Sequence, residues 1–136
     1  MAVKSELEVF VRFDFRGKSL SPQVTVDLDL QMEQQGHLSD FKLMLARENG
    51  IDLYSYEFEV MESLPIVVRR ATGLAEQFSL QGVFDAEGFE ARWRVLKEQQ
   101  QIEAVALEYL DRETLEQNPQ WQAALLAVYQ LGKRGL

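Results

Sequence analysis

Two aspartates, Asp27 and Asp29, stand two positions apart in a predicted strand and are the first candidates for chemistry. Paired carboxylates can hold a hard cation or act as general acid and base, as they do in glycosidases. Alternating acids are also typical of the solvent-facing side of a strand, where Arg12 would lie opposite Asp27. We therefore interpret the two aspartates as surface residues and predict no catalytic residue.

His37 is the only histidine, and the chain has no cysteine. This composition excludes zinc sites built from several His or Cys side chains, thiolate nucleophiles and disulfides. Ser39 lies two residues after His37, but no G-x-S-x-G motif is present. The sequence Gly17-Lys18-Ser19 matches the end of a phosphate loop, yet Arg12 occupies the position of the required upstream glycine. We predict no metal and no cofactor.

Arginine pairs and tyrosines could line a ligand pocket between a sheet and its helices. A pair of adjacent arginines, or a pair on one strand face, could bind a phosphate or carboxylate, or could pair with neighbouring glutamates. The tyrosines would form an aromatic cage only if exposed, and their spacing is typical of a core. The candidate ligand-binding residues are Arg69, Arg70, Arg92, Arg94, Tyr54 and Tyr56.

Two stretches with apolar residues at every second position, 7–15 and 24–32, predict strands with one buried face. The turn-forming residues between them predict a hairpin. The apolar positions are odd in the first strand and even in the second, so opposed residues must have numbers with an odd sum. A sum of 39 places Val11 opposite Leu28, Arg12 opposite Asp27, and Phe10 opposite Asp29.

The middle of the chain predicts a mixture of elements. We expect a short helix from Phe41 to about Asn49, capped by Ser39 or Asp40, and then a strand over 51–62 in which aromatic residues alternate with polar ones. Residues 65–70 stay open between helix and strand, whereas helix is favoured for 71–78.

The last third predicts a second hairpin over 79–96, which turns at residues 85–88. Residues 97–110 fit either helix or strand, and helix is favoured from Asp111. Asn118-Pro119 marks the start of a C-terminal helix. Trp121, Leu125, Val128 and Leu131 are expected on one face of this helix, and Trp121 and Leu125 are predicted to be buried against the sheet.

The chain has 136 residues, which predicts one domain over 1–136. We expect an α+β fold: an antiparallel sheet of about five or more strands with an N-terminal hairpin, packed by two or more helices that include the C-terminal one. No apolar run reaches the ~20 residues of a membrane span, and no signal peptide is evident. We therefore expect a cytoplasmic protein.

The net charge is −8, distributed as −2, −4 and −2 over residues 1–50, 51–100 and 101–136. The chain has no basic arm for nucleic acid or for an anionic membrane surface, so we expect neither as a partner. Our leading hypothesis is a non-catalytic domain that binds another protein or a second copy of itself. Its candidate residues are Phe10, an aromatic side chain on an otherwise polar strand face, together with Arg12 and Asp29.

Overall fold

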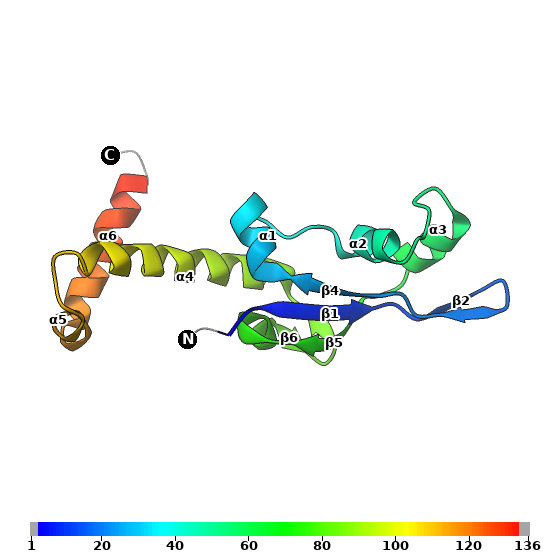
Figure 1. Ribbon diagram of the computed structural model, residues 1–136, viewed down its shortest axis with the longest axis horizontal. Helices are drawn as coiled ribbons and strands as arrows, with labels where there is room; N and C mark the ends of the chain where they lie inside the picture. Colours follow the sequence, from blue (N-terminus) through cyan, green and yellow to red (C-terminus); the bar gives the residue numbers. More distant parts are fainter. Residues whose placement is uncertain (1–2, 134–136) are drawn as a thin grey trace. The chain divides into compact units, whose positions relative to one another are not determined.

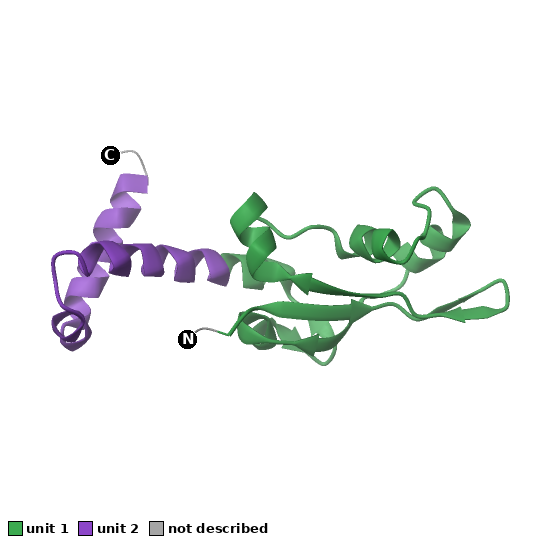
Figure 2. Cartoon of the chain, viewed as in Figure 1, with its two compact units in different colours: residues 1–91 green, residues 92–136 purple. Residues whose placement is uncertain are grey.

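The computed structural model describes residues 3–133, and within them the chain has a mixed α+β fold with strands in antiparallel sheets and a C-terminal helix. Two compact units are formed by residues 1–91 and 92–136 (Figure 2). That the whole chain is one domain stays a prediction. The elements in order are β1 (Glu6–Phe10), β2 (Phe13–Phe15), β3 (Lys18–Leu20), β4 (Gln23–Asp27), α1 (Leu28–Gln35), α2 (Phe41–Glu48), α3 (Tyr56–Glu62), β5 (Val67–Ala71), the 3-10 helix η1 (Gly73–Phe78), β6 (Ser79–Leu80), β7 (Val83–Phe84), α4 (Ala86–Ala106), α5 (Arg112–Gln117) and α6 (Pro119–Lys133).

The N-terminal hairpin is confirmed, but its register differs from the predicted one. Leu7 lies opposite Val26 in the β1–β4 pair, and Phe13 lies opposite Leu20 in the β2–β3 pair. In both pairs opposed numbers sum to 33, which is odd as the parity argument requires but is not 39. The difference arises at the turn, because Arg16 and Gly17 both have positive φ and close a two-residue turn in place of a long loop.

The predicted second strand ends early, since residues 28–32 belong to helix α1. Asp27 caps this helix by accepting a hydrogen bond from Leu30 N at 3.0 Å. The pairs Val11–Leu28, Arg12–Asp27 and Phe10–Asp29 are therefore wrong. Alternation of apolar and polar residues continued past Asp27, but a capping side chain at that position decided the structure of the next eight residues.

The main sheet has the strand order β4-β1-β5, and helices α1, α2 and α3 lie along one side of the long hairpin (Figure 1). The odd-numbered residues Leu7, Val9 and Val11 are fully buried, as predicted. The core of the first unit continues into the helices through Leu28, Met32, Leu45, Ala46, Phe58 and Met61.

The predicted strand over 51–62 is wrong, because helix α3 begins at Tyr56. Ser55 caps this helix with a side-chain oxygen that accepts from Phe58 N. The short helix over 41–48 is confirmed, with Asp40 as its N-cap. Residues 67–70, left open by the sequence, belong to β5, which extends to Ala71. Of the helix favoured over 71–78, residues 73–78 form the 3-10 helix η1.

The second hairpin lies over 79–84, and its turn is Gln81-Gly82, not residues 85–88. Asp85 accepts a hydrogen bond from Gly88 N at 2.9 Å just before α4, so the supposed turn is the start of a helix. Phe89 is fully buried there, with ring centroids of Phe78 and Phe84 at 6.3 and 5.7 Å. Residues 97–106 are helical.

The C-terminal helix α6 begins at Pro119, as predicted, but its predicted burial is wrong. Trp121 is 45 % exposed and Val128 is 66 % exposed, while Leu125 is half-buried. Helix periodicity identified the apolar face of α6 correctly; it could not identify what that face contacts.

Candidate functional site

The even-numbered side chains of β1 point away from the core, onto a surface that we call the outer sheet face. It consists of Glu6, Glu8 and Phe10 of β1, Gln23 of β4, and Arg69 and Arg70 of β5. Phe10 is half-buried, whereas both arginines are exposed. This surface joins Phe10 of the predicted protein-binding set to Arg69 and Arg70 of the predicted ligand-binding set.

A β-bulge explains how two adjacent arginines reach the same face. Arg70 lies opposite Glu8 and Val68 lies opposite Val9, so Arg69 is the extra residue of β5. Both guanidinium groups lie beside the Glu8 carboxylate, at 3.6 Å for Arg69 and 3.8 Å for Arg70. No periodicity in the sequence marks this bulge, and regular alternation would have placed the two side chains on opposite faces.

Phe10 is contacted by two arginines. The Arg12 and Arg69 guanidinium carbons lie 5.7 and 5.1 Å from the Phe10 ring centroid, within the range of cation–π attraction. Arg69 also donates a hydrogen bond to Gln23 Oε1 at 2.7 Å. The aromatic ring, the two guanidinium groups and the amide therefore form one connected cluster at this end of the sheet.

Asp29 lies at the other end of the β1–β4 pair, where its carboxylate is hydrogen-bonded within the fold. It is in the first turn of α1 and accepts a hydrogen bond from Ser5 N at 2.8 Å. The neighbouring Asp27 pairs with Lys4 at 2.7 Å, not with Arg12. Burial acts to raise the pKa of Asp27, but the hydrogen bonds from Lys4 and from Leu30 N, with the charge of Lys4, hold that pKa below its ordinary value.

Of the other four candidate ligand residues, Tyr54 and Tyr56 lie just before and at the start of α3, and Arg92 and Arg94 lie on α4. Tyr54 is 98 % exposed before α3, and Tyr56 is 73 % exposed in its first turn. Arg92 and Arg94 lie on α4, where residues two apart point in nearly opposite directions, so their predicted shared strand face is wrong. Neither tyrosine lines the cavities described below.

His37 is exposed, with Nδ1 3.1 Å from Leu38 O. Within residues 3–133, no group of three His, Cys, Asp or Glu side chains has the arrangement of a metal site. None of the helices in this part of the chain is long and apolar enough to cross a membrane.

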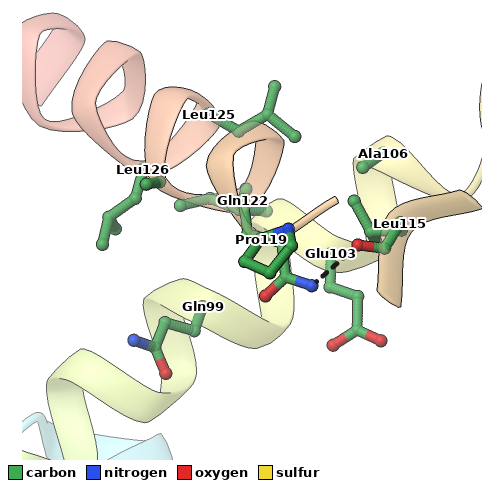
Figure 3. Close-up of a pocket in the computed structure, with 10 residues that line it drawn as sticks. Gln99, Glu103, Ala106, Leu115, Pro119, Gln122, Leu125 and Leu126 are labelled. Carbon is green, nitrogen blue, oxygen red and sulfur yellow. Dashed lines mark hydrogen bonds between the residues drawn. The ribbon is translucent and has the colours of Figure 1, made fainter. Parts of the chain in front are cut away.

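A cavity of about 360 Å³ lies in the second unit, among α4, α5 and α6 (Figure 3). Its lining is mixed: Ile102, Leu115, Leu125 and Leu126 are apolar, whereas Gln99, Glu103 and Gln122 are polar. Gln122 points across it and donates a hydrogen bond to Leu115 O at 3.0 Å. Sequence reasoning missed this cavity, because it assigned α6 to the sheet.

A shallower groove of about 590 Å³ follows β4, one of the two edge strands of the main sheet. Glu8, Asp27 and Glu48 are among its lining residues, together with Gln31 and Met44 of the helices. Asn49 donates to Gln23 O at 3.1 Å and so occupies part of the edge. The groove combines carboxylates and amides with the Thr25 hydroxyl, and no histidine lines it.

No family model, curated protein or solved structure matches this chain. Proposals about its function therefore rest on the geometry of its own residues.

Proposed function

We propose that this protein is a non-catalytic binding domain that holds an acidic segment of another protein on its outer sheet face. The observation that supports the proposal is the Phe10 ring with the guanidinium groups of Arg12 and Arg69 at 5.7 and 5.1 Å. Aromatic and arginine side chains dominate the energetics of protein interfaces. Phe10 lies in β1, the central strand of the main sheet, so its backbone is already ordered before a partner binds.

The charges around Phe10 favour a partner that carries carboxylates. Arg12 makes no salt bridge with the residues that the structure describes. Arg69 lies 3.6 Å from the Glu8 carboxylate, and Arg70 lies 3.8 Å from Glu8 and 4.0 Å from Glu6. Three guanidinium groups thus accompany two carboxylates on this surface, and Arg12 contacts neither of them, on a protein whose net charge is −8. Exposed pairs of this kind are weak, so an incoming carboxylate can exchange with Glu8.

The alternative of a small-ligand pocket has less support. It required tyrosines and an arginine around one deep cavity, whereas Tyr54 and Tyr56 are exposed and line neither the cavity of about 360 Å³ nor the groove of about 590 Å³. A cytoplasmic location stays a prediction.

The proposal is tested with peptides selected from a random 12-residue display library against the full chain. We expect the selected peptides to be rich in Asp and Glu beside an apolar residue. Binding measured by fluorescence anisotropy should weaken at least about tenfold for Phe10→Ser and for Arg69→Gln, and it should weaken as salt is added.

Phe15→Ser is the matched control, because Phe15 is also half-buried, with the Arg16 guanidinium carbon 5.2 Å from its ring centroid. It should leave peptide affinity unchanged. Selected peptides without acidic residues, or equal losses for Phe10→Ser and Phe15→Ser, would contradict the proposal. A Phe10→Ser variant that is destabilised in circular dichroism, but that binds the peptide with wild-type affinity while folded, would show that Phe10 serves the fold and not binding.

A further inference from the structure

Helix α6 is unusual in a chain of which 26 % is charged. From Pro119 to Gly132 it has no charged side chain, and Lys133 is its only charged residue among those that the structure describes. Depletion of charge distinguishes the buried centre of a protein interface from ordinary surface. The composition of α6 is therefore that of a covered helix.

One side of α6 is held within its own unit. Gln130 and Lys133 both bind the Glu98 carboxylate of α4, and the Lys133 hydrogen bond lowers the pKa of Glu98. Gln122, on the same side, binds Leu115 O. At helical spacing, these three residues share one face of α6.

The opposite side of α6 is open. Trp121, Val128 and Leu131 follow one another at helical spacing, and they are 45 %, 66 % and 46 % exposed. No residue of α6 is buried. An apolar stripe of this kind loses favourable burial as long as it faces water.

The core of the second unit is also small. Of its described residues, only Ala106 and Leu115 are buried, and a cavity of about 360 Å³ separates its helices. A unit of this size without disulfides or metals is rarely stable on so small a core. Association with further helices would supply the missing burial.

The distribution of charge is compatible with a second copy of this chain as the occupant, which we infer. Residues 92–136 contain six basic and six acidic side chains, so this unit is neutral, and the first unit carries the whole net charge of −8. Two copies can therefore approach through their second units without net repulsion, whereas contact through the first units is opposed. An antiparallel α6 pair also sets the positive end of each helix dipole beside the negative end of the other.

We propose that the open face of α6, with Trp121, Val128 and Leu131, is a two-fold dimer interface. It pairs α6 of one chain with α6 of another, as an isologous contact requires. The proposal is independent of peptide binding at the outer sheet face.

The test measures the mass of the full chain in solution by sedimentation equilibrium between 1 and 200 µM. We expect twice the 15.7 kDa of one chain at the upper end of this range. Val128→Lys should raise the dimer dissociation constant at least about tenfold. Val83→Lys is the matched control, because Val83 is also 66 % exposed but lies in β7, and it should leave the constant unchanged.

A cross-link provides a second measurement. The chain lacks cysteine, so Val128→Cys introduces a single thiol, which should give a disulfide-linked dimer on oxidation, whereas Val83→Cys should not. A wild-type chain that stays monomeric at 200 µM would overturn the proposal. Equal effects of Val128→Lys and Val83→Lys, or equal cross-linking at both positions, would overturn it as well.

Discussion

Arg16 and Gln81 have the same left-handed backbone conformation, with φ of 51° and 52°, and each is followed by a glycine with positive φ. Each pair of residues closes a two-residue hairpin, between β2 and β3 in one case and between β6 and β7 in the other. Two consecutive residues with φ > 0 are the signature of the type I′ turn, whose twist matches that of the strands. Arginine and glutamine are poorly suited to this conformation, which asparagine adopts more readily.

Arg16→Asn and Gln81→Asn should each stabilise the protein by about 0.5–1 kcal/mol, because asparagine relieves the left-handed strain. The double substitution should be nearly additive, since the turns belong to different sheets. Urea denaturation followed by circular dichroism measures both effects. Arg16→Ala removes the same side chain without relieving the strain, so a stabilisation as large as that of Arg16→Asn would contradict the explanation.

The aromatic cluster around Phe89 should contribute far more to the free energy of unfolding than Trp121 does. Phe89→Ala should cost about 3–5 kcal/mol, because Phe89 is fully buried between Phe78 and Phe84. Trp121→Ala should cost less than half as much at 1 µM protein, since Trp121 is 45 % exposed. Equal costs in urea denaturation would show that Trp121 is covered in the single chain.

Gly73 should tolerate a side chain much less well than Gly36, although both have positive φ. A Cβ at position 73 would lie 2.6 Å from Val3 O and 2.9 Å from Lys4 O, whereas a Cβ at position 36 meets nothing within 4 Å. Gly36→Ala should cost about 1 kcal/mol from backbone strain alone. Gly73→Ala should cost at least about 2 kcal/mol more in thermal unfolding, and a cost equal to that of Gly36→Ala would disprove the close approach.

Asp27 should stabilise the protein in two separable ways, as the cap of α1 and as the partner of Lys4. Asp27→Ala removes both and should cost about 0.5–2 kcal/mol at pH 7, the range for a lost N-cap. Asp27→Asn keeps a capping oxygen and should cost less. Chemical denaturation of the two variants checks the order, and a larger loss for Asp27→Asn would contradict the capping role.

Asp27 should also make the stability of the protein depend on pH. Because the folded pKa of Asp27 lies below its ordinary value, its charge stabilises the fold above the unfolded pKa of about 3.9, and this contribution is lost as the pH falls through the lower, folded pKa. The wild-type chain should therefore lose its advantage over Asp27→Asn below about pH 4. Melting temperatures from pH 7 to pH 2 measure this convergence, and a constant difference would contradict it.

The sequence predicted the fold class, the hairpin, the C-terminal helix and the buried odd positions of β1, because these follow from local periodicity and capping residues. The predictions failed where a single polar side chain determined whether the segment after it formed a strand or a helix. Asp27 and Ser55 each fit the solvent side of a strand, yet each accepts a hydrogen bond from a backbone N–H of the helix that follows.

The candidate site could be predicted only in part. Phe10 was identified as an aromatic residue on a polar face, but its neighbour Arg69 is 59 positions away in the sequence and reaches it through a bulge. A bulge depends on the pairing of two strands, so neither strand indicates it alone. The register was missed for a related reason, since a left-handed arginine at position 16 is rare and the sequence favoured a longer loop.

The uneven distribution of charge has a consequence for the physical behaviour of the protein at high concentration. Residues 1–91 carry a net charge of −8, whereas residues 92–136 are net neutral and include the exposed apolar face of α6. Electrostatic repulsion between the first units of different molecules opposes the growth of clusters, while the net-neutral second units can still associate. Added salt screens only the first of these forces, so colloidal stability should be lost at high ionic strength long before the fold itself is affected.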